Sequence, residues 1–485
     1  MSMHDVEQLS FDFFNGRPVD IEISDAQMSS DAGLLPIREF DDRIRFTEQF
    51  IAALQDLRQS ANVKHSLASM VRQRIYGTLA DYEDQNDHDI LRNDPVFQLI
   101  CGRTPGDEAS ALASQPTLSR FENGVSIRDL WRLRDVFVNH FIQSFEAPPA
   151  RITLDMDAFD DPAHGQQQLT FFHGHYDQNQ YLPIGITCAE NDMTVLVGLR
   201  HGTCAASLGA DDDLRYLARR LRAAWPDVEI VVRGDAGFGM PIMYDVCREL
   251  RLTFTFGIGV NPILKRESKA LMDQAIAQYA ETKEPQRLFM SLMYQAESWP
   301  TPQRVVIKCE ANDIGTNCRS VVTNRAGAEV LIQPVYDEYT ERGESENRNK
   351  EIKRGVCGDR LSDHRFVANY FRLFLYAAAL NMLVLLRRHV ATPLTAADLS
   401  ESGDLPNDIP IEAFAGADRK RVFNRRRAKD PLGEGHAETW RSRLIKVAAE
   451  VFVRARRIVI RLSSSWPHLD DFHAVSRRIL NLVPK

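Results

Sequence analysis

The sequence predicts an α/β protein in which helices flank a mixed sheet, with a β-rich insertion, an all-α N-terminal domain and a helical basic C-terminal region. Apolar side chains recur at helical spacing from about residue 34 to residue 147. From Ile152 onward, short runs of strand type alternate with helical segments. Such alternation is typical of a layered α/β domain. Beyond residue 418 the chain becomes strongly basic.

Three domains are expected along the chain. Residues 1–149 are expected to form a helical, DNA-binding N-terminal domain. Residues 150–391 are expected to form the α/β domain, with its β-rich insertion at about 262–330, and residues 392–485 a linker and a basic helical region. The expected strands are ITLDMDAF, YLPIGITCAE, MTVLVGLRHG, VEIVVRGD and LTFTFGI.

The composition excludes several classes of protein. The 485 residues carry a formal net charge of −8, which excludes a generally basic nucleic-acid coat but not a local basic surface. Seven cysteines without a Cys-x-x-Cys pair exclude a disulfide scaffold and a standard zinc ribbon, and they favour a reducing cytosol. The longest apolar run, Leu373–Leu386, is short for a bilayer span. It predicts a buried core helix, and no membrane partner is expected.

A basic segment lies near the C-terminus. Residues 418–461 contain 14 Lys and Arg against 5 Asp and Glu, a balance of +9. Arg425, Arg426 and Arg427 form its densest cluster, and the cations of 440–462 recur at the spacing of an amphipathic helix. Clustered arginines suit DNA, because each neutralised phosphate releases counterions. A solvated tail is the alternative, and the two interpretations have about equal weight.

Two expected strands carry carboxylates in an apolar setting. Asp155 and Asp157 lie two residues apart and therefore project from the same face of their strand. Asp235 follows VEIVVRG directly, at the carboxyl edge where α/β sheets bind ligands. Because a buried carboxylate is costly unless a cation or donor meets it, these residues indicate a site at which a cation or a hydrogen-bond donor meets the carboxylates. The alternative is a wet strand end without function.

The stretch from Tyr339 to Lys353 is predicted to form one polar helix. Offsets of 3, 7 and 14 residues place Tyr339, Arg342, Glu346 and Lys353 within about 60° of one another on one face. Because that face carries no apolar residue, it is not a core stripe. It suits a phosphate polymer beside a metal, and a solvated, salt-bridged helix is the alternative.

This spacing resembles the YREK signature of bacterial insertion-sequence transposases of the DDE, RNase H-like class. Asp157 in LDMDAF resembles the first family aspartate, and Asp235 in RGDAGF resembles the second. The segments SSDAGLL and LASQPTLSRFEN resemble one subgroup, so that the likeness extends from about residue 10 to 475. It implies an RNase H-like fold and a DNA transposase that cuts transposon ends and transfers them to target DNA, with hairpin ends as one route.

The resemblance also implies a site. Asp157, Asp235 and Glu346 would be catalytic and would hold two divalent ions, Mg²⁺ or Mn²⁺. The other residues of the signature would bind the phosphates of the DNA end: Tyr339, Arg342 and Lys353. Trp299, in the insertion, is a candidate platform for a stacked base, with plain packing as the alternative.

One residue departs from the family pattern. Phe159 stands where the family usually has Thr or Ser, two residues after the first aspartate. The departure leaves two registers open, with Asp155 or Asp157 as the first ligand, and Asp157 is preferred. Asp160 and Asp161 are then expected to be exposed loop acids.

Partners and location follow from the same resemblance. The expected partners are double-stranded DNA, as terminal inverted repeats and target, and a second copy of the chain in the synaptic complex. The expected location is the cytoplasm, at the bacterial nucleoid. The alternative functions are a catalytically inactive DNA-binding protein derived from such an enzyme, and a metal-dependent nuclease without strand transfer.

Overall fold

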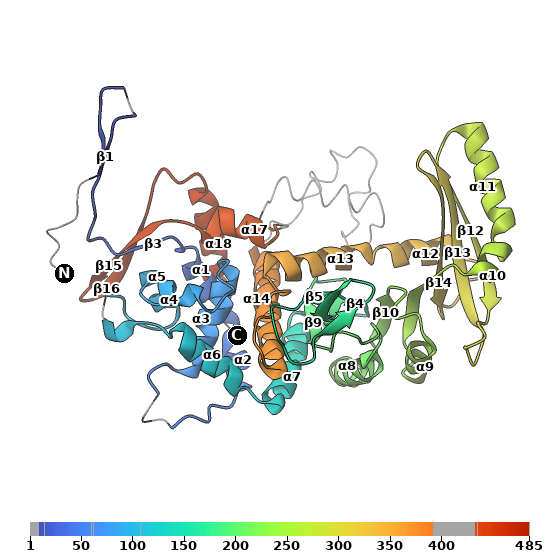
Figure 1. Cartoon of the computed structure of the whole chain (residues 1–485), viewed down its shortest axis with the longest axis horizontal. Helices are drawn as coiled ribbons and strands as arrows, with labels where there is room; N and C mark the ends of the chain where they lie inside the picture. The colour runs from blue at the N-terminus through green and yellow to red at the C-terminus, as the bar shows by residue number, and fades with distance from the viewer. Residues whose placement is uncertain are drawn as a thin grey trace.

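The computed structural model describes residues 9–13, 15–59, 61, 63–106, 108–390, 432–433 and 435–484. Figure 1 shows an elongated molecule, with the N-terminal helices and the C-terminal strands at one end. A sheet flanked by helices lies in the middle, and long strands with helices beside them form the other end. The expected linker and the cluster Arg425, Arg426 and Arg427 lie outside the described residues.

An eight-stranded mixed sheet forms the centre of the molecule, in the order β12-β13-β14-β11-β10-β4-β8-β9. β10 is parallel to both β4 and β11, and the other neighbouring pairs are antiparallel. The strands are β4 (Arg151–Ala158), β8 (Ile184–Cys188), β9 (Thr194–Gly198), β10 (Glu229–Gly234), β11 (Thr253–Ile258), β12 (Gln286–Tyr294), β13 (Gln303–Asn312) and β14 (Gly315–Thr323). This mixed sheet between helices confirms the predicted RNase H-like α/β fold.

Helices cover the sheet. They include α8 (Ala210–Ala224), α9 (Pro241–Glu249) and α14 (Phe366–Val390). By length and composition α14 could cross a membrane, but 94% of its most apolar window is buried inside the protein. The buried Asn381 amide exchanges hydrogen bonds with the Thr194 backbone of β9 at 2.9 and 2.8 Å, so this polar group is satisfied in the core. The predicted core helix is confirmed.

The N-terminal part is mostly helical, and three short strands near its start depart from the predicted all-α domain. Its elements are β1 (Leu9–Phe11), β2 (Val19–Ile21), β3 (Met28–Ser29), α1 (Leu34–Ile44), α2 (Phe46–Ala52), α3 (Leu67–Leu79), α4 (Asp87–Leu91), α5 (Pro95–Ile100), η2 (Glu108–Ser110), α6 (Gln115–Gly124) and α7 (Ile127–Gln143). Ser126 and Asp129 form a capping box that starts α7. Buried Glu122 of α6 pairs with Arg74 of α3 and Arg372 of α14, which joins these helices to the sheet layer.

The predicted β-rich insertion continues the central sheet. It contains α10 (Pro262–Glu267), α11 (Lys269–Thr282) and the strands β12 to β14. β14 pairs with β11, and β13 and β12 follow outward from it. A smaller sheet of β5 (Asp161–Pro162), β7 (Gln178–Tyr181) and β6 (Phe171–His173) lies beside the end of β4.

The amphipathic helix predicted over 440–462 is wrong. Only α17 (Ala437–Trp440) and the π-helical turn η5 (Arg441–Ile445) are helical there, and the strands β15 (Ala449–Arg454) and β16 (Arg457–Leu462) follow. The segment VFVRARRIVIRL contains five valines and isoleucines, and these β-branched residues favour strands. β15 pairs with β3 of the N-terminal part, and α18 (Leu469–Leu480) contacts α1 and α14.

Candidate active site

Asp157 and Asp235 lie at one edge of the central sheet, on neighbouring strands. In the parallel β4–β10 pair the register runs to Met156 opposite Gly234, so the next residues, Asp157 and Asp235, are neighbours. Adjacent strands lie about 4.8 Å apart, which brings these two side chains to the same edge. Asp235 begins the turn after β10, where its Oδ1 accepts the Gly237 N–H at 2.9 Å.

Asp155 has a different environment. It is 2% exposed, and Arg233 of β10 donates to both of its carboxylate oxygens, at 2.6 and 2.7 Å. Arg233 also donates to the Glu338 carbonyl at 2.6 Å. The Arg233 guanidinium thus bonds both carboxylate oxygens of Asp155, the atoms that a metal ion would need. Both side chains are buried, so Asp155 is closed to solvent. The geometry therefore favours Asp157 as the accessible carboxylate of β4.

The predicted polar helix is interrupted. It consists of α12 (Ile332–Thr340), a turn at residues 341–342, α13 (Gly343–Lys350) and the π-helical turn η3 (Glu351–Gly355). Arg342 in the turn keeps helical angles, with φ −54° and ψ −22°, so the two helices run in line in Figure 1. The π turn gives Lys353 a direction that an uninterrupted α-helix would not give it.

Polar side chains of this helix region reach the acidic edge. Nη1 of Arg342 lies 3.6 Å from Oδ2 of Asp157, and Nδ2 of Asn349 donates to the same oxygen at 2.8 Å. Nζ of Lys353 lies 2.7 Å from Oδ1 of Asp160. The structure therefore brings Arg342 and Lys353, far from β4 in sequence, to the carboxylates at its end.

Glu346 belongs to α13, and its side chain lies outside the described part of the structure. Its position in the helix is nevertheless informative, because it comes four residues after Arg342 and three before Asn349. Residues three and four apart share one helix face. Since both neighbours contact Asp157, position 346 lies on the face of α13 that meets β4.

Tyr339 lies against β11, beside the turn that holds Asp235. A Cβ atom added to Gly257 would lie 2.7 Å from the Tyr339 hydroxyl oxygen and 3.0 Å from the Ala236 nitrogen. Burial raises the pKa of Tyr339, an effect that nearby Arg342 opposes and Asp235 reinforces. The hydroxyl is therefore a neutral hydrogen-bond donor at neutral pH.

In the variant Gly257→Ala, the DNA cleavage that the family resemblance implies should fall by one to two orders of magnitude, on the order of what a misplacement of 1 Å costs. The new methyl group would push on Tyr339 and on the backbone of the Asp235 turn. Gly259→Ala is the matched control, because nothing lies within 4 Å of its added Cβ. Initial cleavage rates of the two variants measure the effect, and equal rates would contradict this packing.

Two residues near the acids carried no sequence signal. Asn349 contacts Asp157 only because the helix crosses the strand, and Tyr176 lies in the turn between β6 and β7. Burial raises the pKa of Tyr176, and the carboxylates of Asp160, Asp157 and Asp235 raise it further. The Tyr176 hydroxyl therefore lies close enough to these three carboxylates to interact with their charge. Such long-range neighbours leave no spacing pattern in the chain.

The expectation that Asp160 and Asp161 are exposed loop acids is wrong for Asp161. Asp161 is fully buried in β5, and burial followed by the nearby charge of Asp359 raises its pKa well above the usual range. Asp160 is partly exposed. It pairs with Lys353 and accepts a hydrogen bond from the side-chain amide of Gln178 at 3.4 Å. Asp161 is buried because the chain after β4 enters the small sheet, in which β5 pairs with β7.

A buried carboxylate holds the end of this helix region in place. Glu351 is 4% exposed, and it pairs with Arg348 at 2.8 Å and with Arg387 of α14 at 2.7 Å. Burial acts to raise the pKa of Glu351, but Arg387, His436 and Arg348 together hold it below its ordinary value. The Glu351 carboxylate thus stays charged and joins η3 to the core helix.

Trp299 is packed among aromatic rings. Its ring meets Tyr244 and Tyr294 edge to face, with centroids 5.3 and 5.4 Å apart. It is half-buried and contributes to the hydrophobic core. This environment favours the plain-packing alternative over a platform for a base.

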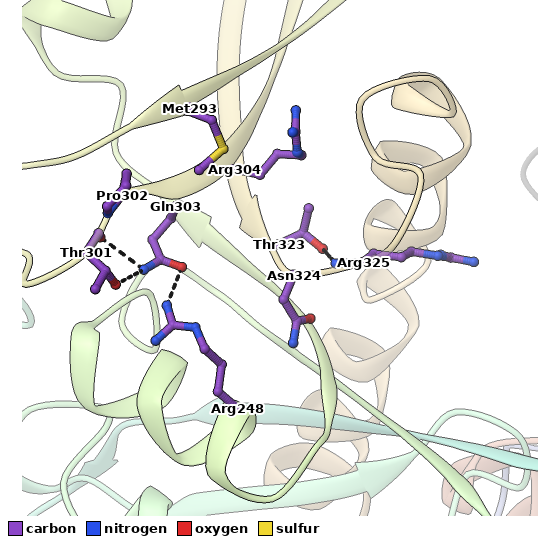
Figure 2. Close-up of a pocket in the computed structure, with 9 residues that line it drawn as sticks. All are labelled: Arg248, Met293, Thr301, Pro302, Gln303, Arg304, Thr323, Asn324 and Arg325. Carbon is purple, nitrogen blue, oxygen red and sulfur yellow. Dashed lines mark hydrogen bonds between the residues drawn. The ribbon is translucent and has the colours of Figure 1, made fainter.

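A groove of about 530 Å³ lies at the opposite edge of the sheet (Figure 2). Its lining includes Arg248, Arg304 and Arg325, and Arg248 donates to Gln303 at 2.6 Å. Asn324, also in the lining, bonds the N–H of Phe254 at the start of β11. Because Asp157 and Asp235 lie at the other ends of the parallel strands, this groove is separate from the acidic edge.

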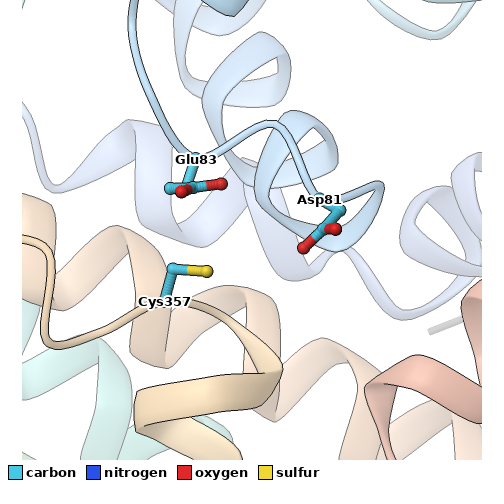
Figure 3. A group of neighbouring side chains, drawn as sticks. All are labelled: Asp81, Glu83 and Cys357. Carbon is cyan, nitrogen blue, oxygen red and sulfur yellow. The ribbon is translucent and has the colours of Figure 1, made fainter.

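A second group of ligand-type side chains lies between the N-terminal helices and η3 (Figure 3). The ligand atoms of Asp81, Glu83 and Cys357 lie within 4.8 Å of one another. Asp81 pairs with Arg441 at 3.0 Å, and Glu83 pairs with Arg360. Burial raises the pKa of the Cys357 thiol to about 11, so this thiol is protonated at neutral pH. We assign Asp81 and Glu83 to ion pairs that join the N-terminal helices to the chain after η3 and to η5, and not to a metal site.

The comparison with protein families fits this geometry. The family model described as transposase DDE domain, group 1, matches residues 11–401. No curated protein matches the chain. The match extends over the N-terminal helices, the whole central sheet and the helix region with Glu346. The chain belongs to this family, and it is a transposase of the DDE class.

Proposed function

We propose that the protein cuts the ends of an insertion sequence and joins them to target DNA, with Asp157, Asp235 and Glu346 as catalytic ligands of two divalent ions. The observation that carries the proposal is the meeting of three elements at one sheet edge. Asp157 and Asp235 end adjacent parallel strands, and the helix face around position 346 contacts Asp157.

The donor set suits Mg²⁺ or Mn²⁺. Aspartate and glutamate offer hard oxygen atoms, which these ions prefer. When bound, two such ions stabilise the attacking and leaving oxygens of phosphodiester cleavage and activate the nucleophile. In the structure, the charge of Asp157 is met by Arg342 and by the Asn349 amide, so this carboxylate sits among groups that stabilise its ionised form.

The other signature residues have the chemistry to hold DNA. Arg342 and Lys353 present a guanidinium and an ammonium group beside the acids, and Tyr339 offers a neutral hydroxyl donor. We assign these three groups to the phosphates that flank the scissile bond. Their contacts would orient the DNA strand and offset its charge as it approaches the carboxylates.

The remaining features of the proposal follow from the family. Hairpin ends are one route of excision in transposases that carry the YREK signature. The active assembly would be a dimer on paired ends, located at the nucleoid.

One assay tests the function. The protein is incubated with Mg²⁺ and a labelled duplex that carries the inverted repeat flanking its own coding sequence, with a scrambled repeat as control. The proposal expects nicked, cleaved and joined products from the true end alone. Binding without cleavage would identify an inactive DNA-binding protein, and cleavage without joining would identify a nuclease.

A further inference from the structure

The strands β15 and β16 form a ribbon that projects beyond its sheet. β3 pairs only with Ala449 and Glu450 of β15, and the Val451 N–H bonds the Gln27 carbonyl at 2.8 Å. From Phe452 onward the ribbon has two strands only. Figure 1 places the ribbon at the end of the molecule opposite to β12 and β13.

Arginines gather on one face and at the tip of this ribbon. Arg454 lies directly opposite Arg457 in the register, Arg461 shares their face, and Arg456 stands in the two-residue turn. Arg454, Arg456 and Arg457 are exposed, and within the described residues none of them has a carboxylate within 4.0 Å. Arg461 lies over the ring of Phe452, 4.3 Å from its centroid.

This arrangement is unfavourable for the isolated chain. Like charges directly opposite one another on a ribbon destabilise it, and opposite charges would stabilise it. Glu450 shares this face opposite Arg461, with Oε2 4.0 Å from Nη1, but within the described residues no carboxylate pairs with the three arginines of the tip. Breaks in such local rules are expected at functional sites, where a ligand provides the missing charge.

The shape of the ribbon and its charge point to one partner. The major groove of duplex DNA, about 12 Å wide, admits a two-stranded ribbon, and its walls carry phosphates. The opposite face adds Val453 and Ile458, which are 45% and 40% exposed and able to meet apolar base edges. DNA is also the substrate that the family implies.

We propose that the β15–β16 ribbon docks in the major groove of duplex DNA, with Arg454, Arg456 and Arg457 on the phosphates at the groove edges. This inference rests on the proposed function for its DNA partner, but it concerns a surface apart from the carboxylates. The ribbon would hold a DNA segment distant from the cleaved bond, so that it contributes to binding and not to the chemical step.

The salt dependence of binding tests this role. In the full chain, Arg454→Gln, Arg456→Gln and Arg457→Gln are combined, and the affinity for a labelled random-sequence duplex is measured from low to moderate salt. Each phosphate contact contributes about 0.9 to the slope of log affinity against log salt. The slope should therefore fall by about 2.7, and the corresponding triple lysine variant should keep most of it.

The matched control removes the same charge elsewhere. Arg219→Gln, Arg222→Gln and Arg251→Gln alter α8 and the turn that follows α9, and they should leave the slope unchanged. Equal losses in both triple variants would overturn the proposal, because general charge would then explain binding. A ribbon variant that keeps the wild-type slope would also overturn it. Unfolding midpoints of all variants identify any loss that comes from misfolding.

Two further measurements distinguish a failure of the proposed ribbon docking from a failure of the proposed function. Methylation of guanine N7, which lies in the major groove, should interfere with wild-type binding and not with binding by the ribbon variant. Interference that persists in the ribbon variant would contradict docking in this groove. With saturating protein at low salt, the ribbon variant should cleave a transposon end at the wild-type rate. If the wild type itself fails to cleave, the proposed function fails, while the salt slopes still decide the role of the ribbon.

Discussion

The variant Glu346→Gln should lose DNA cleavage by a factor on the order of a thousand or more while it still binds the transposon end. The amide keeps the size of the side chain but removes the negative charge that a divalent ion requires. Loss of several kcal/mol of transition-state stabilisation corresponds to such a factor. Cleavage rates and end affinity, measured on the same labelled duplex, give the two quantities.

Glu344→Gln is the control for this variant. Position 344 lies two residues earlier in α13, about 200° around the helix from position 346, and the substitution makes the same chemical change. The control should cleave at close to the wild-type rate. If Glu346→Gln retains normal cleavage, or if both variants lose it equally, Glu346 does not have the assigned role.

The variant Asp155→Ala should destabilise the fold by about 3–5 kcal/mol, because it leaves the buried guanidinium of Arg233 without its partner. The variant Asp157→Asn, two residues further along β4, should lose cleavage and change stability far less. Urea unfolding monitored by circular dichroism measures the free energy of unfolding of each variant.

A double replacement checks the reason for this loss. Asp155→Leu combined with Arg233→Met removes both charges and should recover most of the stability, since a well-packed apolar pair often replaces a buried ion pair without cost. If Asp155→Ala unfolds normally but loses cleavage, Asp155 is the first metal ligand and the register proposed for β4 is wrong.

Local patterns predicted the parts of the site that depend on single elements. The apolar runs before Asp157 and Asp235 fix both residues at strand ends, and parallel strands share a carboxyl edge. The regular offsets from Tyr339 to Lys353 predicted one helix face, and in the structure Arg342 and Lys353 both reach the acidic edge, although a turn and a π turn interrupt the helix.

The features that depend on contacts between distant segments could not be predicted from the sequence. Asn349 meets Asp157 across 192 positions of the chain, and Asp161 is buried by a small sheet that forms beside β4. The ribbon of residues 449–462 resembled a helix because arginines at 454, 457 and 461 fit both periods. Its β-branched residues and the pairing with β3 decided in favour of strands.

The most direct test of the shared metal site uses Fe²⁺ in place of Mg²⁺. Bound Fe²⁺ with ascorbate and peroxide generates hydroxyl radicals that cut the backbone beside its ligands, and fragment masses locate the cuts. The account predicts cuts near residues 157, 235 and 346 in the same preparation, all suppressed by excess Mg²⁺ and all weakened by Asp157→Asn. Cuts near residue 155 without any near 346, or cuts only near Asp81 and Glu83, would contradict it.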